Sequence, residues 1–191
     1  MEEKIRPCLE KGEKLLWCSR PEAFETLDAT HKKPFIRGTV ISAAAALIIT
    51  ALYVFLAKKN GAPIMPLLIA VILVAAALGP IHTFTYASKL RDKTIYAATD
   101  HRLIILSNDL KSADYEGIKA AAFKKDSDGH ATLLCGEDAL KFEPRKWRIA
   151  ALFPTFDNEA KGGPVVDRFA FYAVDNSELL SSILSPYVKL Q

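Results

Sequence analysis

Six basic residues border two long apolar stretches, and their positions suit the recognition of an anion. They are Lys32, Lys33, Arg37, Lys89, Arg91 and Lys93. A cation beside an anionic leaflet is attracted to it by about 1 kcal/mol. The pattern therefore predicts contacts with anionic lipid headgroups or, in the simpler alternative, residues that only fix the orientation of membrane spans.

The remaining polar residues show no arrangement typical of a catalytic or metal site. The histidines are scattered, without a second ligand at helical or turn spacing; they are His31, His82, His101 and His130. Asp126 and Asp128 before Gly129 resemble the start of a calcium loop, but the later glutamate is missing, so a turn is expected. The common phosphate-binding, dinucleotide and zinc-protease motifs do not occur. We expect a protein that is not an enzyme and uses no cofactor or metal.

The two apolar stretches must position the basic residues. Gly38–Ala57 and Ala62–Ala87 contain no charged side chain. A helix of about 20 residues is about 30 Å long, which matches the hydrocarbon core of a bilayer. Neither stretch has the polar face that a soluble helix needs. The sequence therefore predicts a transmembrane helical hairpin over residues 36–88, with spans at about 38–57 and 62–87, and not a pair of helices buried in a soluble core.

The distribution of charge predicts the orientation of this hairpin. Only Lys58–Gly61 separates the spans, so both chain ends should emerge on the same side. Basic residues at the outer ends outnumber those in the turn, and such residues remain in the cytoplasm. The charged residues before the first span exclude a cleaved secretory signal. Three cysteines without metal spacing fit a reducing compartment. We expect a multi-pass protein of a cytoplasmic membrane with both termini in the cytoplasm.

The spans themselves contain features that fit another function. Gly79-Pro80 predicts a kink, because proline removes a backbone hydrogen bond. His82 is a candidate for proton transfer or ligand binding, although its place near the boundary favours an imidazole among the headgroups. The small residues Ser42–Ala46 would let another helix approach closely. The alternative function is an accessory subunit of a membrane transport or export complex.

Residues 1–35 form a cytoplasmic N-terminal segment that is too short to bury its own core. Ser19–Glu22 has the pattern of a helix start and predicts a short helix to about Thr30, interrupted by Pro34. Trp17 is expected either at the lipid headgroups or packed against the following domain.

Residues 89–191 have the pattern of an antiparallel β domain. Short segments rich in β-branched and aromatic residues alternate with turn signals. The expected strands are 94–99, 102–106, 117–124, 131–135, 139–143 and 168–174. A short helix is expected between Arg145 and Pro154, and an exposed loop over 158–164. These elements predict a small sandwich or barrel.

The C-terminal residues predict one amphipathic helix. Asp175 is the expected N-cap, with Glu178 three residues later. An apolar stripe follows at helical spacing, made of Leu179, Leu180, Ile183, Leu184, Tyr187 and Val188. The expected fold class is therefore α+β: a transmembrane hairpin and a β-sandwich or barrel closed by a C-terminal helix.

Three stretches resemble bacterial inner-membrane proteins that carry a pleckstrin-homology-like (PH-like) domain. Gly12–Trp17, followed by Arg20-Pro21, resembles the opening of that family ahead of its transmembrane hairpin. Tyr96–Ile105 resembles its Y-x-x-T-x-x-R-apolar hairpin, and Phe171–Asp175 resembles its ending. The resemblance implies a PH-like fold of two packed sheets and a C-terminal helix. It implies no agreed biochemical activity, because fold alone does not determine function.

Within this likeness, Thr99 and Arg102 have a structural explanation that is simpler than ligand binding. Thr99 can cap the turn, and Arg102 can pair with Asp100 or with a carboxylate on the next strand. The net charge of +3, without a basic run interleaved with aromatics, argues against nucleic acid as a partner. We expect a membrane-anchored binding or scaffolding module at the inner leaflet that recruits a protein or a lipid headgroup, or that self-associates.

Overall fold

The chain forms two compact units, one inserted in the sequence of the other. The computed structural model describes residues 1–158 and 164–191, and for residues 79 and 80 it describes the backbone alone. The first unit comprises Met1–Thr30 and Tyr86–Gln191, and the second comprises His31–Thr85. The loop predicted over 158–164 falls mostly outside the described residues.

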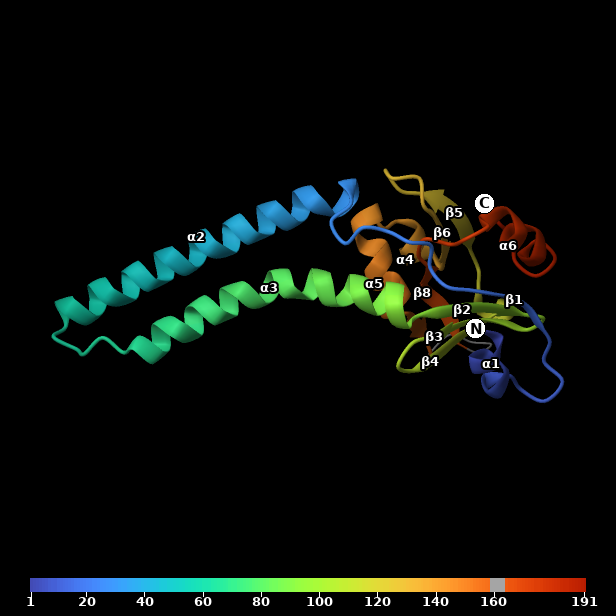
Figure 1. Cartoon of the computed structure of the whole chain (residues 1–191), viewed down its shortest axis with the longest axis horizontal. Helices are drawn as coiled ribbons and strands as arrows, with labels where there is room; N and C mark the ends of the chain where they lie inside the picture. The colour runs from blue at the N-terminus through green and yellow to red at the C-terminus, as the bar shows by residue number, and fades with distance from the viewer. Residues whose placement is uncertain (159–163) are drawn as a thin grey trace. The chain divides into compact units, whose positions relative to one another are not determined.

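Two long helices account for the second unit. Helix α2 spans Ala29–Lys59 and α3 spans Pro66–Lys93, and Figure 1 shows them running antiparallel. Gly61 lies in the turn directly after α2 and has a φ of 66°. The Ala62 N–H donates to the Ala57 carbonyl at 2.9 Å. This is a common helix C-terminus, in which glycine adopts the left-handed conformation at no steric cost. The predicted pair of helices long and apolar enough to cross a membrane is confirmed.

The predictions made for Pro34 and Pro80 have different outcomes. Pro34 lies inside α2, so the predicted interruption there is wrong. A proline this close to a helix start removes one intrahelical hydrogen bond, which the long helix tolerates. Helix α3 continues through residues 79 and 80, and the predicted kink there stays a prediction.

The apolar side chains of the hairpin point outward. In the most apolar window of α2 only 11% of the residues are buried, and in that of α3 none of the described residues is. Leu47, Phe55 and Leu67 are 66%, 64% and 77% exposed. The rings of Phe35 and Phe84 meet edge to face, with centroids 5.5 Å apart. The buried-helix alternative predicts the opposite exposure.

Two antiparallel sheets form the first unit. The first sheet has the order β1-β2-β3-β4, with strands Leu15–Ser19, Ile95–Thr99, Arg102–Leu106 and Leu110–Asp114. The second has the order β5-β6-β8-β7, with strands Ala121–Lys125, Ala131–Cys135, Val165–Phe171 and Thr155–Asp157. The described strands form a sandwich and do not close into a barrel, which corrects the barrel alternative.

One hydrophobic core joins the sheets. Tyr96 and Ala98 face it from β2, and the Tyr96 ring stacks on Phe171 of β8 with centroids 4.5 Å apart. Helix α6, Ser177–Leu184, adds Leu180 and Leu184 to the same core. The predicted amphipathic helix is therefore confirmed, although it begins after Asn176, whose side chain accepts the Leu179 N–H. Asn176 takes the cap because it adopts a left-handed conformation that asparagine tolerates.

Short helices cover the outer faces of both sheets. Ile5 of α1, Glu2–Ile5, is fully buried with Ala97 and Ile104 on the first sheet. Helices α4, Glu137–Leu140, and α5, Trp147–Leu152, pack on the second sheet. Three 3₁₀ turns complete the unit, at Arg6–Cys8, Tyr115–Gly117 and Pro144–Lys146. Because both faces of each sheet are covered, several strands are buried along their whole length.

Several predicted elements are confirmed and others are wrong. Strands 102–106 and 131–135 match β3 and β6, and the short helix before Pro154 is α5. The strand predicted at 139–143 is wrong, since Glu137–Leu140 is helical and buries Ala139 against β8. The strand predicted at 117–124 begins at Ala121, because a 3₁₀ turn occupies its start.

The helix predicted from Ser19 to Thr30 is also wrong. Ser19 ends β1, and Pro21 forms an isolated antiparallel bridge with Val174. The local capping pattern is overridden because this backbone finds partners in the sandwich: the Glu22 N–H donates to the Ala173 carbonyl at 2.6 Å. The N-terminal segment is consequently part of the folded unit.

Gly136 provides a test of this packing. Its φ is 96°, and a Cβ there would overlap the Asp167 carbonyl and lie 2.6 Å from that of Val166. Gly129 has a similar φ of 89° but open space around it. We expect Gly136→Ala to destabilise the detergent-solubilised protein by about 3–5 kcal/mol, from strain and overpacking together. Gly129→Ala, with strain alone, should cost about 1–2 kcal/mol. Equal shifts in thermal unfolding would contradict this reading of Gly136.

Candidate functional site

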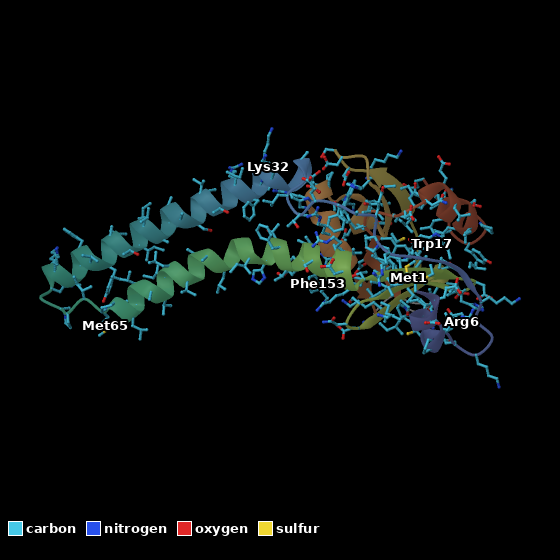
Figure 2. The ribbon with its side chains drawn as sticks, in the orientation of Figure 1. Met1, Arg6, Trp17, Lys32, Met65 and Phe153 are labelled. Atoms are coloured by element: carbon cyan, nitrogen blue, oxygen red, sulfur yellow. The ribbon has the colours of Figure 1, made fainter. Side chains whose placement is uncertain are left out.

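The six predicted basic residues lie at the outer ends of the two long helices. Lys32, Lys33 and Arg37 are exposed near the start of α2, and Figure 2 shows Lys32 projecting from the ribbon. On α3, Arg91 and Lys93 are exposed, whereas Lys89 is half-buried. Arg91 pairs with neighbouring Asp92 at 3.0 Å. The two groups belong to different units, and their contact with lipid stays a prediction.

Arg102, by contrast, is held between the first sheet and the N-terminal segment, on the face of β3 opposite the shared core. Its guanidinium makes a bidentate contact with Glu13, with Nε to Oε1 at 2.9 Å and Nη2 to Oε2 at 3.0 Å. Glu10 adds a contact to Nη1 at 2.9 Å. The side chains of Arg102 and Glu13 are 12% and 2% exposed. This pairing fastens the segment before β1 to β3.

Thr99 belongs to the same network. Its hydroxyl lies 2.8 Å from Glu13 Oε1 and accepts the Arg102 N–H at 3.0 Å. The predicted capping of the turn is confirmed. The predicted partners of Arg102 were Asp100 or a carboxylate on the next strand, but its ion pairs are with Glu13 and Glu10. Local spacing could not identify glutamates so distant in sequence.

The network changes the acidity of Glu13. Burial by itself raises the pKa of this carboxyl, but hydrogen bonds from Arg102, the Glu10 N–H and Thr99 outweigh it and lower the pKa to about 2. Hydrogen bonds to the charged form of a carboxylate always act in this direction. Glu13 is therefore ionised at neutral pH and committed to Arg102.

Arg148 forms a second buried network, at the segment that leads into α2. Its guanidinium donates to the Thr26 and Glu25 carbonyls at 2.8 Å each and to Asp28 Oδ2 at 2.6 Å. It also lies over the Phe24 ring, 4.5 Å from the centroid. Arg148 and Asp28 are 3% and 5% exposed. An arginine on α5 thus holds residues 24–28, which have no regular secondary structure of their own.

The turn between β5 and β6 extends this network. Asp126 Oδ2 lies 3.2 Å from the Tyr172 hydroxyl, which in turn lies 3.3 Å from Asp28 Oδ2. Asp126 Oδ1 accepts the backbone N–H of His130 at 2.9 Å. Asp128 accepts the N–H of Ala29, the first residue of α2, at 3.1 Å. The stretch that resembles a calcium loop is a turn, as predicted, and its carboxylates accept backbone and hydroxyl hydrogens.

A cavity of about 470 Å³ adjoins the network. Its lining is Ala23, Phe24, Glu25, Asp28, Ala29, Asp128 and His130. Asp28 and Asp128 already have partners, so these carboxylates hold the protein's own chain. Among the described residues, no three or more His, Cys, Asp or Glu side chains are placed to hold a metal ion. The contacts in this region fix the start of α2.

The three stretches that carry the PH-like resemblance meet in one place. Trp17 is 8% exposed, and its ring stacks on Phe171 with centroids 6.1 Å apart. The Tyr172 N–H donates to the Tyr96 hydroxyl at 3.1 Å. Trp17 therefore packs against the domain, the second of its two predicted positions. These motif residues build the core of the sandwich.

Comparisons with known proteins give no support to this resemblance: no family model, no curated protein and no solved structure matches the chain.

The sequence predicts the turn at Asp126 but not the network that links it to Arg148 and Asp28. One signal was available: Arg148 interrupts an otherwise apolar helix, Trp147–Leu152, and a charge in such a place needs a buried partner. Asp28 and Asp126 carry no comparable signal, because an aspartate beside a turn or a helix start is common.

The Glu13 pairing predicts a dependence of stability on acid. The pKa of Glu13 is lower in the folded state, so the stabilisation is complete above about 4.5 and is lost as the pH falls towards about 2. We expect the parent protein to lose on the order of 3 kcal/mol more than Glu13→Gln across this window, measured by urea unfolding in detergent. Glu10→Gln is the matched control; its exposed pair should contribute less than about 1 kcal/mol. Parallel acid profiles for parent and Glu13→Gln would contradict the assignment.

The Arg148 network predicts a large cost for one substitution. Arg148→Met leaves the buried Asp28 carboxylate without its cation, and removing one partner of a buried pair costs about 3–5 kcal/mol. Adding Asp28→Leu should restore part of this stability. Arg145→Met is the control, because the Arg145 side chain is 52% exposed and its pair with Glu143 lies on the surface. Thermal unfolding and amide exchange at residues 22–30 measure the effect; slow exchange there in Arg148→Met would refute the role given to this arginine.

Proposed function

We propose that this chain is a membrane-anchored, non-catalytic binding module of the PH-like kind, at the cytoplasmic face of a bacterial inner membrane. The outward-facing apolar side chains of α2 and α3 carry the proposal. Burying one leucine or phenylalanine side chain is worth about 1.5–3 kcal/mol. Soluble proteins rarely expose large continuous apolar surfaces, whereas a bilayer covers them.

The charge pattern supports the cytoplasmic orientation. Lys32, Lys33, Arg37, Lys89, Arg91 and Lys93 border the outer ends of the helices. Only Lys58 and Lys59 are basic in the turn between them. Residues of this kind remain on the cytoplasmic side, and beside an anionic leaflet they can also contact lipid headgroups. Both termini are then cytoplasmic.

The architecture of the sandwich supports a PH-like module. Two packed antiparallel sheets followed by one helix that enters their shared core are what the resemblance implies. Two buried carboxylates of the unit are engaged internally: Glu13 binds Arg102, and Asp28 binds Arg148. Burial also raises the pKa of the Cys135 thiol, so this sulfur stays protonated and is a poor nucleophile. The proposed role is to recruit a protein or lipid at the membrane.

Membrane anchoring can be tested with charges placed on the helices. Leu47 and Leu73 are 66% and 49% exposed. An arginine at the centre of a span costs about 3 kcal/mol of insertion free energy, so Leu47→Arg with Leu73→Arg should remove most of the chain from the carbonate-resistant membrane fraction. The control is Leu110→Arg, at a 45% exposed leucine of the sandwich, which should remain membrane-bound.

Two further readouts separate the possible outcomes. A fluorescent reporter at Gln191 that folds only in the cytoplasm should be active in the parent. Crosslinking in native membranes should capture a soluble partner or lipid; capture of a multi-span transporter would favour the alternative, an accessory transport subunit. A parent chain that purifies as a monodisperse soluble particle without detergent would refute the anchor itself.

A further inference from the structure

Helix α5 leaves one narrow apolar face uncovered. Trp147, Arg148 and Ala150 to Leu152 are all buried, but Ile149 is 39% exposed, and Phe153 directly after the helix is 41% exposed. Arg145 and Lys146 precede Ile149 by about one turn and are also exposed. Residues four apart lie on one side of a helix, so these side chains form a single strip. We call Arg145, Lys146, Ile149, Phe153 and Lys111 the α5 surface.

Lys111 belongs to this surface through its contacts. Its ammonium lies 5.5 Å from the centroid of the Phe153 ring and donates to the Leu152 carbonyl at 2.6 Å. Burial, and then the nearby charge of Lys89, lower the pKa of Lys111. A cation beside an exposed aromatic ring, with a second basic residue near enough to lower its pKa, provides a place for an anion. The acidic neighbours of this surface are Glu143, paired with Arg145 at 2.7 Å, and Asp109, whose charge acts on Lys111.

The position of Phe153 along α3 indicates what covers it. Its ring meets Tyr86 edge to face, with centroids 5.4 Å apart, and Figure 2 shows Phe153 beside the C-terminal part of α3. Tyr86 stands at the end of the uncharged run Ala62–Ala87, and Lys89, Arg91 and Lys93 follow it. If that run crosses a bilayer, Tyr86 lies within about one helical turn of the hydrocarbon edge. Phe153, in contact with Tyr86, must lie at the same depth.

We propose that the α5 surface is a lipid contact, with Ile149 and Phe153 inserted at the edge of the acyl region and Lys111, Arg145 and Lys146 against anionic headgroups. This inference rests on the proposed membrane anchor and adds a second attachment, made by the sandwich unit itself. Aromatic and basic side chains are the types that occupy this zone of a membrane protein. The surface thereby fixes which side of the sandwich faces the leaflet.

Depth-dependent fluorescence quenching tests the inference on the full chain. Phe153→Trp and Leu179→Trp place the indole at positions of similar exposure, 41% and 47%, the second on α6. Each variant is reconstituted in phosphatidylcholine–phosphatidylglycerol vesicles with or without lipid brominated near the carbonyl end of the chain. The signal of Trp17 and Trp147 is subtracted using the parent protein. We expect at least threefold stronger bromolipid quenching at 153 than at 179, and the reverse order with aqueous acrylamide. Ile149→Trp repeats the measurement independently if Phe153→Trp folds poorly.

The outcomes separate this inference from the proposal on which it rests. Equal, weak bromolipid quenching at both positions, in vesicles that still float with the protein, overturns the lipid contact and leaves the anchor intact. Protection at 153 from both quenchers means that a protein surface covers the strip, which also overturns it. Failure of the parent chain to float with the vesicles overturns the anchor itself.

Discussion

The contact between Arg148 and Asp28 is the constraint on which the segment between β1 and α2 depends. Residues 22–28 lie between β1 and α2 without regular structure, so their backbone carbonyls need partners from elsewhere. Arg148 supplies hydrogens to two of them and a counter-charge to Asp28. Desolvating both charges is expensive, and a pair of this kind is favourable only when its remaining hydrogen-bonding groups are also satisfied. Both Nη groups of Arg148 meet that condition, with Tyr172 and the Phe24 ring beside them, whereas its buried Nε has no hydrogen-bond partner among the described residues.

A second ion pair, between Arg102 and Glu13, holds the beginning of the chain against the first sheet. β1 carries Trp17 into the common core, and Glu13 just before it is bound by Arg102 on β3. The first thirty residues cannot bury a core by themselves, yet they contribute an edge strand, a core tryptophan and the three carboxylates that pair with Arg102 and Arg148. The β sandwich is therefore assembled from two segments of sequence that the hairpin separates.

The parts of this structure that sequence could predict are those with a strong local pattern. The apolar runs predicted the two helices, and alternation with turn residues predicted β2, β3 and β6. The stripe from Leu179 to Val188 predicted α6, although Leu179 is exposed and the helix ends at Leu184. The predictions that were wrong concern segments whose partners lie far away in the sequence. Ser19–Glu22 has every local mark of a helix start, but Ser19 pairs with Tyr96 and Pro21 with Val174, which lie far along the sequence. The candidate networks escaped prediction for the same reason: Glu13 and Arg102, or Asp28 and Arg148, are brought together only by the completed fold.

β1 and β2 are neighbours in the sheet but lie far apart in the sequence, and this distance affects how the unit can form. Cys18 of β1 pairs with Ala97 of β2, and α2 and α3 occupy most of the chain between them. Closing a flexible loop of such length costs entropy, and contacts distant in sequence slow folding. Two antiparallel helices remove most of this cost, because α2 begins and α3 ends at the same end of the hairpin (Figure 1). A formed hairpin therefore favours the pairing of β1 with β2, because less entropy is lost when the two strands meet. The two long helices thus connect the two parts of the sandwich at a low entropic cost.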